Sequence, residues 1–483
     1  MIMAAPTVPV PLPGRIAAGD EAYQRAVDSH DPRFDGVFYV AITTTRIYCR
    51  PVCPSRNAAH DHRRFFDSAA AAERAGFRPC LRCRPELAPG RAVSNVLSRL
   101  ANAAVQRIAA GALNGRSVAD LARELGVGER HLRRALEREM GVAPLALAQT
   151  HRLLLAKRLL ADTELPVTRV AYASGFQSLR RFNAAFREQY GLPPSTLRRG
   201  RVHRRKAEGP APALRLALAY RSPFAWGMLL DTLRRTATPG LAAVHGCRYG
   251  RTVHINGHTG VVWAEDADEH KHLTVDLSES LLPVLMPLIA GLRRLFDLDA
   301  EPAVVNAHLE QGGLGDLVAR HPGLRIPGAL DGFEVALHAL LGARVGRRVT
   351  AALGTPLPAA LAGQGLTHVP PNAAQVAKAG AAALIALGAA PPQAACVTAL
   401  ASAVAAGGLR LEPGSDVAAV RRALLAIDGV SEEAASVIEM RALAWPDAFP
   451  ITDPAVVARA EQCRPWRAYA ALHLWLDQER PRR

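Results

Sequence analysis

The chain is poor in several features that mark whole classes of protein. Its 483 residues include only seven cysteines, four of which lie in two close pairs suited to a metal ion, and this fits a reducing compartment better than the disulfide framework of a secreted protein. No unbroken apolar run approaches the roughly 20 residues that a membrane-spanning helix needs. Residues 1–14 are apolar, but they lack a basic residue and contain four prolines, which would break the apolar helix of a signal peptide. We therefore expect a cytoplasmic protein with a disordered tail over residues 1–14 and no membrane partner.

Positive charge is abundant but concentrated in one part of the chain. The formal net charge is +16, and residues 93–206 alone hold 21 basic and 8 acidic residues. Residues 1–92 hold 13 basic and 9 acidic residues, and residues 207–483 hold 25 and 26. A local excess of this size is typical of a nucleic-acid binder and makes an ordinary solvated surface a weak explanation. Charge alone therefore predicts DNA or RNA binding only for the middle of the chain.

Four of the cysteines form two close pairs. Cys49 and Cys53 form a C-x3-C pair, and Cys80 and Cys83 form a C-x2-C pair about 26 residues later. This spacing lets two short knuckles converge on one Zn²⁺, which keeps thiolates ionised at neutral pH. Most four-cysteine sites are purely structural. Here the same loops carry guanidinium groups suited to phosphate, namely Arg50, Arg56, Arg78, Arg82 and Arg84. The isolated Cys247, Cys396 and Cys463 are predicted to be ordinary small apolar residues.

The segments VAITTTRIYCRPVC and AGFRPCLRCRP closely resemble the amino-terminal domain of the Ada proteins of the adaptive response to alkylation. The resemblance implies a small zinc-binding α/β domain, which we place at residues 15–90. It implies that Cys49 accepts the methyl group of a methylphosphotriester in DNA and that the other three cysteines complete the zinc site. It also implies contacts to the DNA backbone from Thr45, Arg56, Arg78 and Arg82. Pro54 stands where the family can carry a further basic residue.

The chemistry of such a site can be followed from charge alone. A zinc-bound thiolate is a nucleophile at neutral pH, and the methyl carbon of a phosphotriester is open to in-line displacement. Four thiolates and one Zn²⁺ carry a formal charge of −2, which methylation of one sulfur reduces to −1. Removing this repulsion is worth on the order of 2–3 kcal/mol for a phosphate ~5–8 Å away at an effective dielectric of ~20. Methylation should therefore convert a weak DNA binder into a tighter one.

The basic middle block contains two copies of a helix-turn-helix pattern. In residues 117–136, Ser117 caps a helix and Gly126 makes the turn. In residues 166–186, Gly175 makes the corresponding turn. A long apolar-striped helix over residues 145–160 should fix the spacing of the two units. The second helix of each unit is predicted to expose residues toward the major groove, namely Arg130, Arg133 and Arg134 in the first unit, and Gln177, Ser178, Arg180 and Arg181 in the second.

The second unit, with GLPPSTLRR after it, strongly resembles the AraC-type transcription activator domain. We assign residues 93–200 to this all-α domain and residues 201–212, which are polar and basic, to a linker. The resemblance implies binding to successive major-groove segments of double-stranded DNA, a nucleoid-associated location and RNA polymerase as a partner. A helical bundle that does not bind DNA is the weaker alternative.

The last half lacks the Pro-Cys-His-Arg motif of the alkylguanine methyltransferase that follows in Ada proteins, so no repair of the alkylated guanine oxygen is predicted. Residues 214–277 are predicted to form short strands, and residues 281–478 to be mostly helical. LRRLFDLDAEPAVVNAHL, HPGLRIPGALDGFEVALHALLGARV and CRPWRAYAALHLW closely resemble the AlkA class of 3-methyladenine DNA glycosylases. The resemblance implies a small antiparallel sheet domain at 213–300 and a helix-hairpin-helix domain at 301–480 that flips alkylated bases into a pocket. The whole chain is thus expected to be a multidomain α+β protein.

Two residues of this half are candidates for the chemistry of base excision. By resemblance, Asp453 in FPITDPAVVAR is the carboxylate that stabilises an oxocarbenium-like sugar as the base leaves. The same residue, just before Pro454, is also a good helix N-cap. Trp475 falls where the family has a pocket tryptophan that can stack on a cationic base, and a core aromatic is the alternative.

The predicted hairpin departs from the family pattern. Ser431 replaces the second glycine, and three carboxylates stand where a phosphate should bind, on Asp428, Glu432 and Glu433. The family usually has a glutamine at the position of Ala343. It has aromatic residues at the positions of Glu433 and Val437. Two hypotheses therefore stay open: an alkylation sensor and transcription activator fused to an active DNA-3-methyladenine glycosylase II-like domain, or the same activator with a degenerate, non-catalytic domain. A third, weaker hypothesis is an AraC-type transcription regulator that senses a small molecule. The histidines at positions 245, 254, 258, 270 and 272 are predicted to be solvated and not to form a second metal site.

Overall fold

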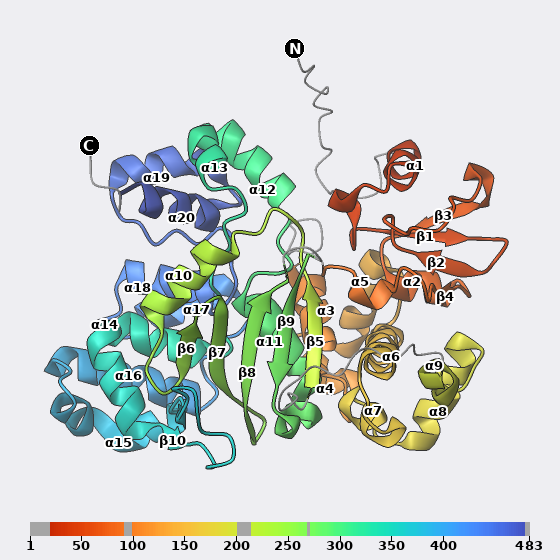
Figure 1. Ribbon diagram of the computed structural model, residues 1–483. Coiled ribbons are helices and arrows are strands. Elements are labelled where there is room, and N and C mark those ends of the chain that lie inside the picture. The colour runs from red at the N-terminus through yellow and green to blue at the C-terminus, as the bar shows by residue number, and fades with distance from the viewer. Residues whose placement is uncertain (1–19, 91–98, 200–213, 268–270, 479–483) are drawn as a thin grey trace.

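The computed structural model describes residues 20–90, 99–199, 214–267 and 271–478 (Figure 1). The predicted tail at 1–14 and the predicted linker at 201–212 lie outside these ranges. The described residues form helices and small sheets in several separate cores, which confirms the multidomain α+β class. Among them, no helix combines the length and the apolar character needed to cross a membrane.

The amino-terminal part is built on a four-stranded sheet with the order β3-β1-β2-β4. Its strands are β1 (Tyr39–Ile42), β2 (Ile47–Cys49), β3 (Arg63–Phe66) and β4 (Arg78–Pro79), with the helices α1 (Asp20–Asp28) and α2 (Ala69–Arg74). Strand β1 pairs antiparallel with β2 and β3, whereas β4 runs parallel to β2. Aromatic side chains fill both sides, with Phe38 and Tyr23 on one side and Tyr48 and Phe77 on the other. Short 3-10 turns complete the loops at Pro32–Phe34, His60–His62 and Pro85–Leu87.

The next part contains the two predicted helix-turn-helix units. The first consists of α4 (Val118–Glu124) and α5 (Glu129–Met140), and the second of α7 (Val167–Ala173) and α8 (Leu179–Tyr190). Ser117 caps α4, the first helix of the first unit, and Ser178 caps α8, the second helix of the second unit. Each serine hydroxyl accepts a hydrogen bond from a backbone N–H group. Gly126 and Gly175 turn the chain at φ +68° and +87°, a conformation that favours glycine. The elements α3 (Arg99–Ala109) and α9 (Pro194–Arg199) flank the units.

Helix α6 (Pro144–Asp162) joins the two units, as the apolar stripe over residues 145–160 predicted. It is buried on more than one side, because it packs against α3, α7 and α9 and also against α2 of the amino-terminal part. Figure 1 shows it directly below the amino-terminal sheet and above α7 and α8.

A five-stranded antiparallel sheet follows, with the order β5-β9-β8-β7-β6. The strands are β5 (Leu214–Ala219), β6 (Ala242–His245), β7 (Arg248–Ile255), β8 (His258–Asp266) and β9 (His272–Leu277), followed by α11 (Leu285–Leu295). The expectation of strands alone over 214–277 was wrong in one place: residues Trp226–Thr236 form helix α10. Its buried Trp226, Leu229, Leu230 and Leu233 recur at helical spacing and pack against the sheet.

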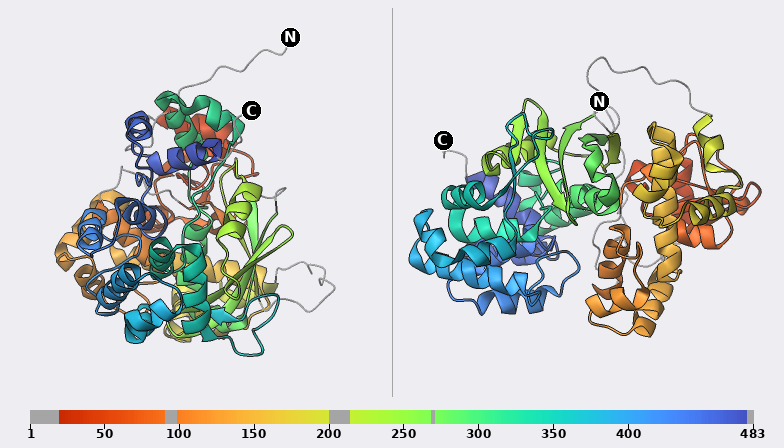
Figure 2. Two further views of the ribbon diagram at one scale, coloured as in Figure 1. Left: turned by 90° about the vertical axis from the view of Figure 1, so that its left-hand side faces the viewer. Right: turned by 90° about the horizontal axis from the view of Figure 1, so that it is seen from below.

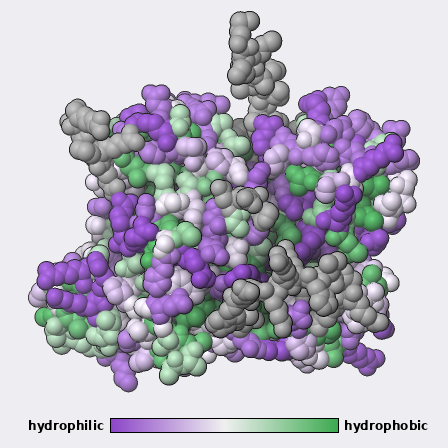
Figure 3. All heavy atoms as spheres, viewed as in Figure 1, coloured by the Kyte–Doolittle hydropathy of each residue, from purple (hydrophilic) through white to green (hydrophobic). Residues whose placement is uncertain are grey.

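The remainder is helical. It contains α12 (Pro302–Leu309), α13 (Gly315–Arg320), α14 (Gly332–Leu353), α15 (Ala373–Ala386), α16 (Pro391–Ala405), α17 (Val417–Leu425), α18 (Glu432–Arg441), α19 (Pro454–Ala460) and α20 (Arg467–Gln478), with the short strands β10 (Thr355–Pro356) and β11 (His368–Val369). One core lies among α14 to α18, and a second lies around α12, α13 and α20. Figure 2 shows this sheet and helical half beside the amino-terminal and helix-turn-helix half. On the face in Figure 3, hydrophilic side chains cover both halves between smaller apolar areas.

Candidate metal centre and DNA-facing residues

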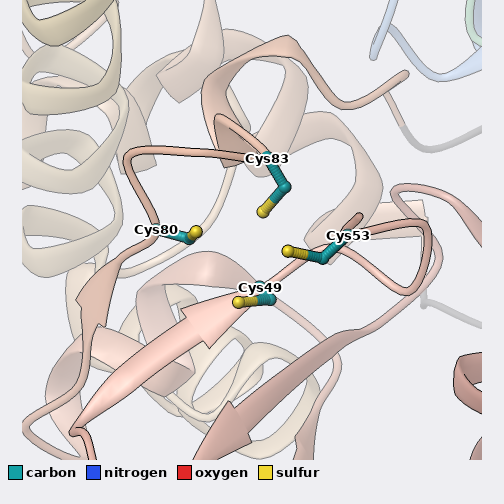
Figure 4. A group of neighbouring side chains, drawn as sticks. All are labelled: Cys49, Cys53, Cys80 and Cys83. Atoms are coloured by element: carbon teal, nitrogen blue, oxygen red, sulfur yellow. The ribbon is translucent and has the colours of Figure 1, made fainter. Parts of the chain in front are cut away.

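The sheet of the amino-terminal part brings the two cysteine pairs together. Tyr48 of β2 pairs with Pro79 of β4 in parallel register, so that the next residues, Cys49 and Cys80, leave their strands side by side. A turn after each strand then brings the second cysteine of each pair back toward the first. Across the first turn, the Cys53 N–H donates to the Arg50 carbonyl at 3.1 Å. The four sulfurs lie within 4.8 Å of one another and point toward a common centre (Figure 4).

This arrangement fits one Zn²⁺. Four sulfurs at mutual distances below 4.8 Å match the closed tetrahedral set that zinc takes from cysteines. They are close enough to share protons: hydrogen bonds with the neighbouring thiols raise the pKa of Cys49 and lower the pKa of Cys53 to about 6. A divalent cation replaces those protons and holds all four groups as thiolates. Cys53, Cys80 and Cys83 are buried, whereas Cys49 is partly exposed.

Two of the four sulfurs are also held by the backbone. The Arg82 N–H donates to the Cys80 sulfur at 3.3 Å, and the Arg50 N–H donates to the Cys83 sulfur at 3.4 Å. Such bonds stabilise negative charge on sulfur and so make a thiolate less reactive. Within the described part of the chain, no backbone N–H donates to the sulfur of Cys49 or of Cys53, and of these two residues only Cys49 is partly exposed.

The arginines of these loops divide into two groups. Thr45, Arg56 and Arg82 are exposed and Arg78 is half-buried, so the side chains predicted to meet the DNA backbone lie at or near the surface. The interpretation of Arg50 and Arg84 as phosphate-binding groups was wrong, because both are engaged by carboxylates. Arg50 donates to Asp35, with Nε 2.8 Å from Oδ1, and Arg84 binds Asp162 through both terminal nitrogens. These two guanidinium groups stabilise the loops instead.

In the helix-turn-helix units, most of the predicted DNA-facing residues are exposed. Arg130 and Arg134 of α5 are exposed, and so are Gln177, Arg180 and Arg181 around the start of α8. Arg133 is half-buried and donates to Glu129, one turn earlier, at 2.6 Å. The Ser178 hydroxyl accepts from the Arg181 N–H at 3.4 Å as the N-cap of α8. Both of these residues therefore also have a structural role.

The two candidates for base excision lie in one region of the helical part. Asp453 is exposed at the N-terminus of α19, where its carboxylate accepts from the N–H groups of Ala455 at 2.8 Å and Val456 at 3.2 Å. Trp475 is half-buried on α20, in the core cluster that also contains Ile451 and Val456 on either side of Asp453. Asp453 is therefore an N-cap, and its exposed carboxylate is also accessible from solvent. Trp475 is part of the core and also reaches the surface.

The predicted hairpin is present as α17, a turn and α18. Gly429 turns the chain at φ +91°, and the Ser431 hydroxyl caps α18. The carboxylates that seemed to oppose a phosphate are partly neutralised, because Arg421 of α17 binds Glu432 and also donates to Glu439 at 2.8 Å. Asp428 and Glu433 remain exposed at the turn. Of the three carboxylates at the turn, Arg421 therefore compensates only Glu432, and it shares its charge with Glu439.

Sequence reasoning missed two residues that support the metal centre. Lys157 of α6 is 2% exposed and donates to the Cys80 carbonyl at 3.0 Å and to Glu86 at 2.5 Å. Asp35 accepts from Arg50, next to Cys49. The sequence held no clear signal for Lys157, because α6 also carries Gln149, Arg152, Arg158 and Asp162. The partners of Asp35 lie too far along the chain for any local pattern to reveal.

The other cysteines and the histidines form no second centre in the part of the chain that the structure describes, where the four cysteines are the one group able to hold a metal ion. His270 is outside that part. Cys396 and Cys463 are buried, as small apolar residues should be. Cys247 contradicts the prediction, because it is exposed in the turn between β6 and β7.

Comparisons with known proteins match three parts of the chain. The profile of the metal binding domain of Ada matches residues 22–86, a helix-turn-helix domain matches residues 121–200, and the AlkA N-terminal domain matches residues 215–331. The probable bifunctional transcriptional activator/DNA repair enzyme AlkA of Mycobacterium tuberculosis is 37% identical over 489 residues, which cover 95% of this chain and 97% of that protein.

Two further relatives each match one half. DNA-3-methyladenine glycosylase 2 of Escherichia coli is 33% identical over 275 residues, or 53% of this chain and 95% of its own length. The bifunctional transcriptional activator/DNA repair enzyme Ada of Escherichia coli is 30% identical over 181 residues, or 38% of this chain and 49% of its own length.

Proposed function

Because this chain belongs to the family of the bifunctional transcriptional activator/DNA repair enzymes AlkA, we propose that it senses alkylated DNA through Cys49, activates transcription and excises alkylated bases. The observation that carries the first part is the cluster of four cysteines in which Cys49 is the partly exposed member. The rest of the proposal depends on the helix-turn-helix units and on the glycosylase-like half.

The sensing step is a transfer of one methyl group from a DNA methylphosphotriester. A lone pair of the Cys49 sulfur attacks the methyl carbon, and the bond from that carbon to the phosphotriester oxygen breaks. The bonding electrons remain on the oxygen, so the DNA regains an ordinary anionic phosphodiester and the sulfur becomes a thioether. A Zn²⁺ ion held by Cys49, Cys53, Cys80 and Cys83 would keep these cysteines deprotonated for this reaction. The exposed Thr45, Arg56 and Arg82, with Arg78, would hold the neighbouring phosphates.

The consequence for transcription follows from charge. The cluster loses one negative charge when Cys49 is methylated, and repulsion of the DNA backbone falls by on the order of 2–3 kcal/mol at ~5–8 Å. The methylated protein would then bind promoter DNA through α5 and α8, with Arg130, Arg134, Gln177, Arg180 and Arg181 at the bases or the backbone. RNA polymerase is the partner expected of an activator that acts in the cytoplasm on the nucleoid. The domain limits 15–90, 93–200, 213–300 and 301–480 stay predictions.

The second activity proposed is that of a DNA-3-methyladenine glycosylase. Asp453 would stabilise positive charge on the sugar while the bond to an alkylated purine breaks, and Trp475 would stack on the cationic base. A base with a positive charge is already a good leaving group, which reduces the need for an acid. The 33% identity over 53% of this chain to a protein named DNA-3-methyladenine glycosylase 2 supports an active domain over a degenerate one.

Each activity has its own test. Purified protein is incubated with duplex DNA containing methylphosphotriesters, and its peptides are examined by mass spectrometry. One methyl group on Cys49, and none after Cys49→Ala, is the expected result; a methyl group on another cysteine would overturn the assignment. For excision, duplex DNA containing N-methylpurines should release free base and leave abasic sites. If no base is released, and Asp453→Asn behaves like the wild type, the glycosylase-like half is non-catalytic.

A further inference from the structure

The amino-terminal zinc domain is not only connected to the helix-turn-helix units by the chain but also packed against them. Helix α2 contacts α6, and strand β4 contacts α8. Arg74 of α2 donates to the carbonyl of Gly141, the C-cap of α5, at 2.5 Å. Gln189 of α8 donates to the carbonyl of Phe77, just before β4, at 3.3 Å. The second helix of each unit therefore touches the zinc domain.

Buried charges hold this packing at the zinc site itself. The Lys157 ammonium and the Glu86 carboxylate have side-chain exposures of 2% and 1%, and they lie 2.5 Å apart. The same ammonium donates to the carbonyl of the zinc ligand Cys80 at 3.0 Å. At the end of α6, five residues after Lys157, Asp162 accepts two bonds from Arg84, at 2.8 and 2.9 Å, and Arg84 lies on the loop that follows Cys83. Arg84 also donates to Glu86 at 3.0 Å, which joins both pairs into one network.

A network of this kind restricts motion strongly. If α6 slid along the zinc-site loops, the Lys157 ammonium would lose its bonds to Glu86 and to the Cys80 carbonyl. It would then be a buried, unpaired charge, and this cost opposes the motion. The long helix α6 in turn fixes the distance between the two helix-turn-helix units. A two-part DNA binder whose parts cannot move relative to one another binds best at one separation of its two sites, whereas a flexibly linked one tolerates several.

We infer that the Lys157–Glu86 pair, with Arg84 and Asp162, clamps the zinc domain to helix α6, so that this protein selects DNA by the spacing between the zinc-domain contact and the helix-turn-helix contacts. Lys157 and Glu86 are thus positioning residues that determine specificity. The inference rests on the proposed function in one respect, because it takes both surfaces to be DNA-binding.

The test uses the full-length protein and the double variant K157M/E86M, which removes the pair without leaving a lone buried charge. The control is R251M/E334M, which removes a comparably buried pair from the other half, where Arg251 and Glu334 lie 2.7 Å apart. The probe is a duplex selected from a random library by the methylated wild-type protein. In a second duplex, one base pair is inserted between the segments protected by the zinc domain and by the helix-turn-helix units. Zinc content and methyl uptake at Cys49 are measured for every variant.

The wild type and the control should lose affinity by about ten-fold or more on the inserted duplex, and K157M/E86M by less than about three-fold, with one zinc per chain and normal methyl uptake. The same spacing penalty in K157M/E86M as in the wild type would overturn the clamp. Loss of zinc from K157M/E86M would also overturn it, because the pair would then be part of the metal site's own stability. A wild-type protein that takes up no methyl group would instead overturn the proposed function, and spacing selectivity measured with a duplex selected by the unmethylated protein would then decide the clamp.

Discussion

Glu73 is the carboxylate whose titration should control how firmly the zinc domain is attached to α6. It accepts from the Tyr48 hydroxyl at 2.9 Å and from the Thr150 hydroxyl of α6 at 2.5 Å. Burial raises its pKa from 4.5 to about 7, against the opposing effect of these two bonds and of the Lys157 charge. A pKa that is higher in the folded state means that the folded protein gains stability by holding the proton. This contribution is complete below about pH 4.5 and is lost as the pH rises through about 7.

The magnitude follows from that shift. The difference between 4.5 and about 7 corresponds to about 3 kcal/mol at 1.36 kcal/mol per unit, and partial contact with water reduces this to about 2 kcal/mol. Glu73→Gln keeps the shape and removes the charge. At about pH 8 the variant should therefore be more stable at this contact than the wild type by about 2 kcal/mol, and at about pH 4 the two should be nearly equal.

Hydrogen exchange measured by mass spectrometry can report this difference locally, even in a protein of several domains. Peptides from α2 and from the Thr150 region of α6 should exchange about 30-fold more slowly in Glu73→Gln than in the wild type at about pH 8, after correction for intrinsic rates. The exposed Glu21 of α1 supplies the control, because Glu21→Gln should change nothing in these peptides. Equal protection of wild type and Glu73→Gln at both pH values would refute the argument from burial.

Two further predictions concern the metal and the hairpin. Removal of zinc by a chelator should unfold residues 22–86, because binding of a structural zinc contributes about 10 kcal/mol or more; far-ultraviolet circular dichroism would show lost structure that returns with added zinc. Gly429→Ala should destabilise the hairpin by about 1–3 kcal/mol, since φ is +91° and the new Cβ would stand 3.2 Å from Cβ of Cys396. Gly407→Ala is the matched control: it has φ +75° but open space, so in thermal unfolding Gly429→Ala should lower the midpoint further.

The parts of the fold that the sequence predicted correctly are those set by short-range patterns. The spacing of the cysteines predicted their convergence, and turn glycines with serine caps predicted both helix-turn-helix units. Helix α10 was missed although Trp226, Leu229, Leu230 and Leu233 follow a helical period, because the short strands around it dominated the interpretation of that segment.

The parts that could not be predicted depend on partners far apart in sequence. Arg50 and Arg84 look like phosphate ligands in a local reading, and only the fold brings Asp35 and Asp162 to them. Arg421 likewise forms ion pairs with Glu432 and Glu439, which the sequence of the acidic hairpin did not indicate. For a charged side chain, the sequence gives the possible chemistry, whereas the nearest opposite charge decides whether that side chain is available for a ligand.

The contact between Arg221 and Asp35 has a consequence for any attempt to divide this polypeptide. Arg221 is 5% exposed and donates to the Asp35 carbonyl at 2.9 and 3.1 Å, while the carboxylate of the same aspartate holds Arg50 beside Cys49. Separation of the two halves between residues 199 and 214 would leave that carbonyl facing water, and Arg221 would lose both bonds to Asp35 while it keeps its bond to the Asp299 carbonyl, at 3.3 Å. Co-expressed as separate polypeptides, the two fragments should reassemble through this loop.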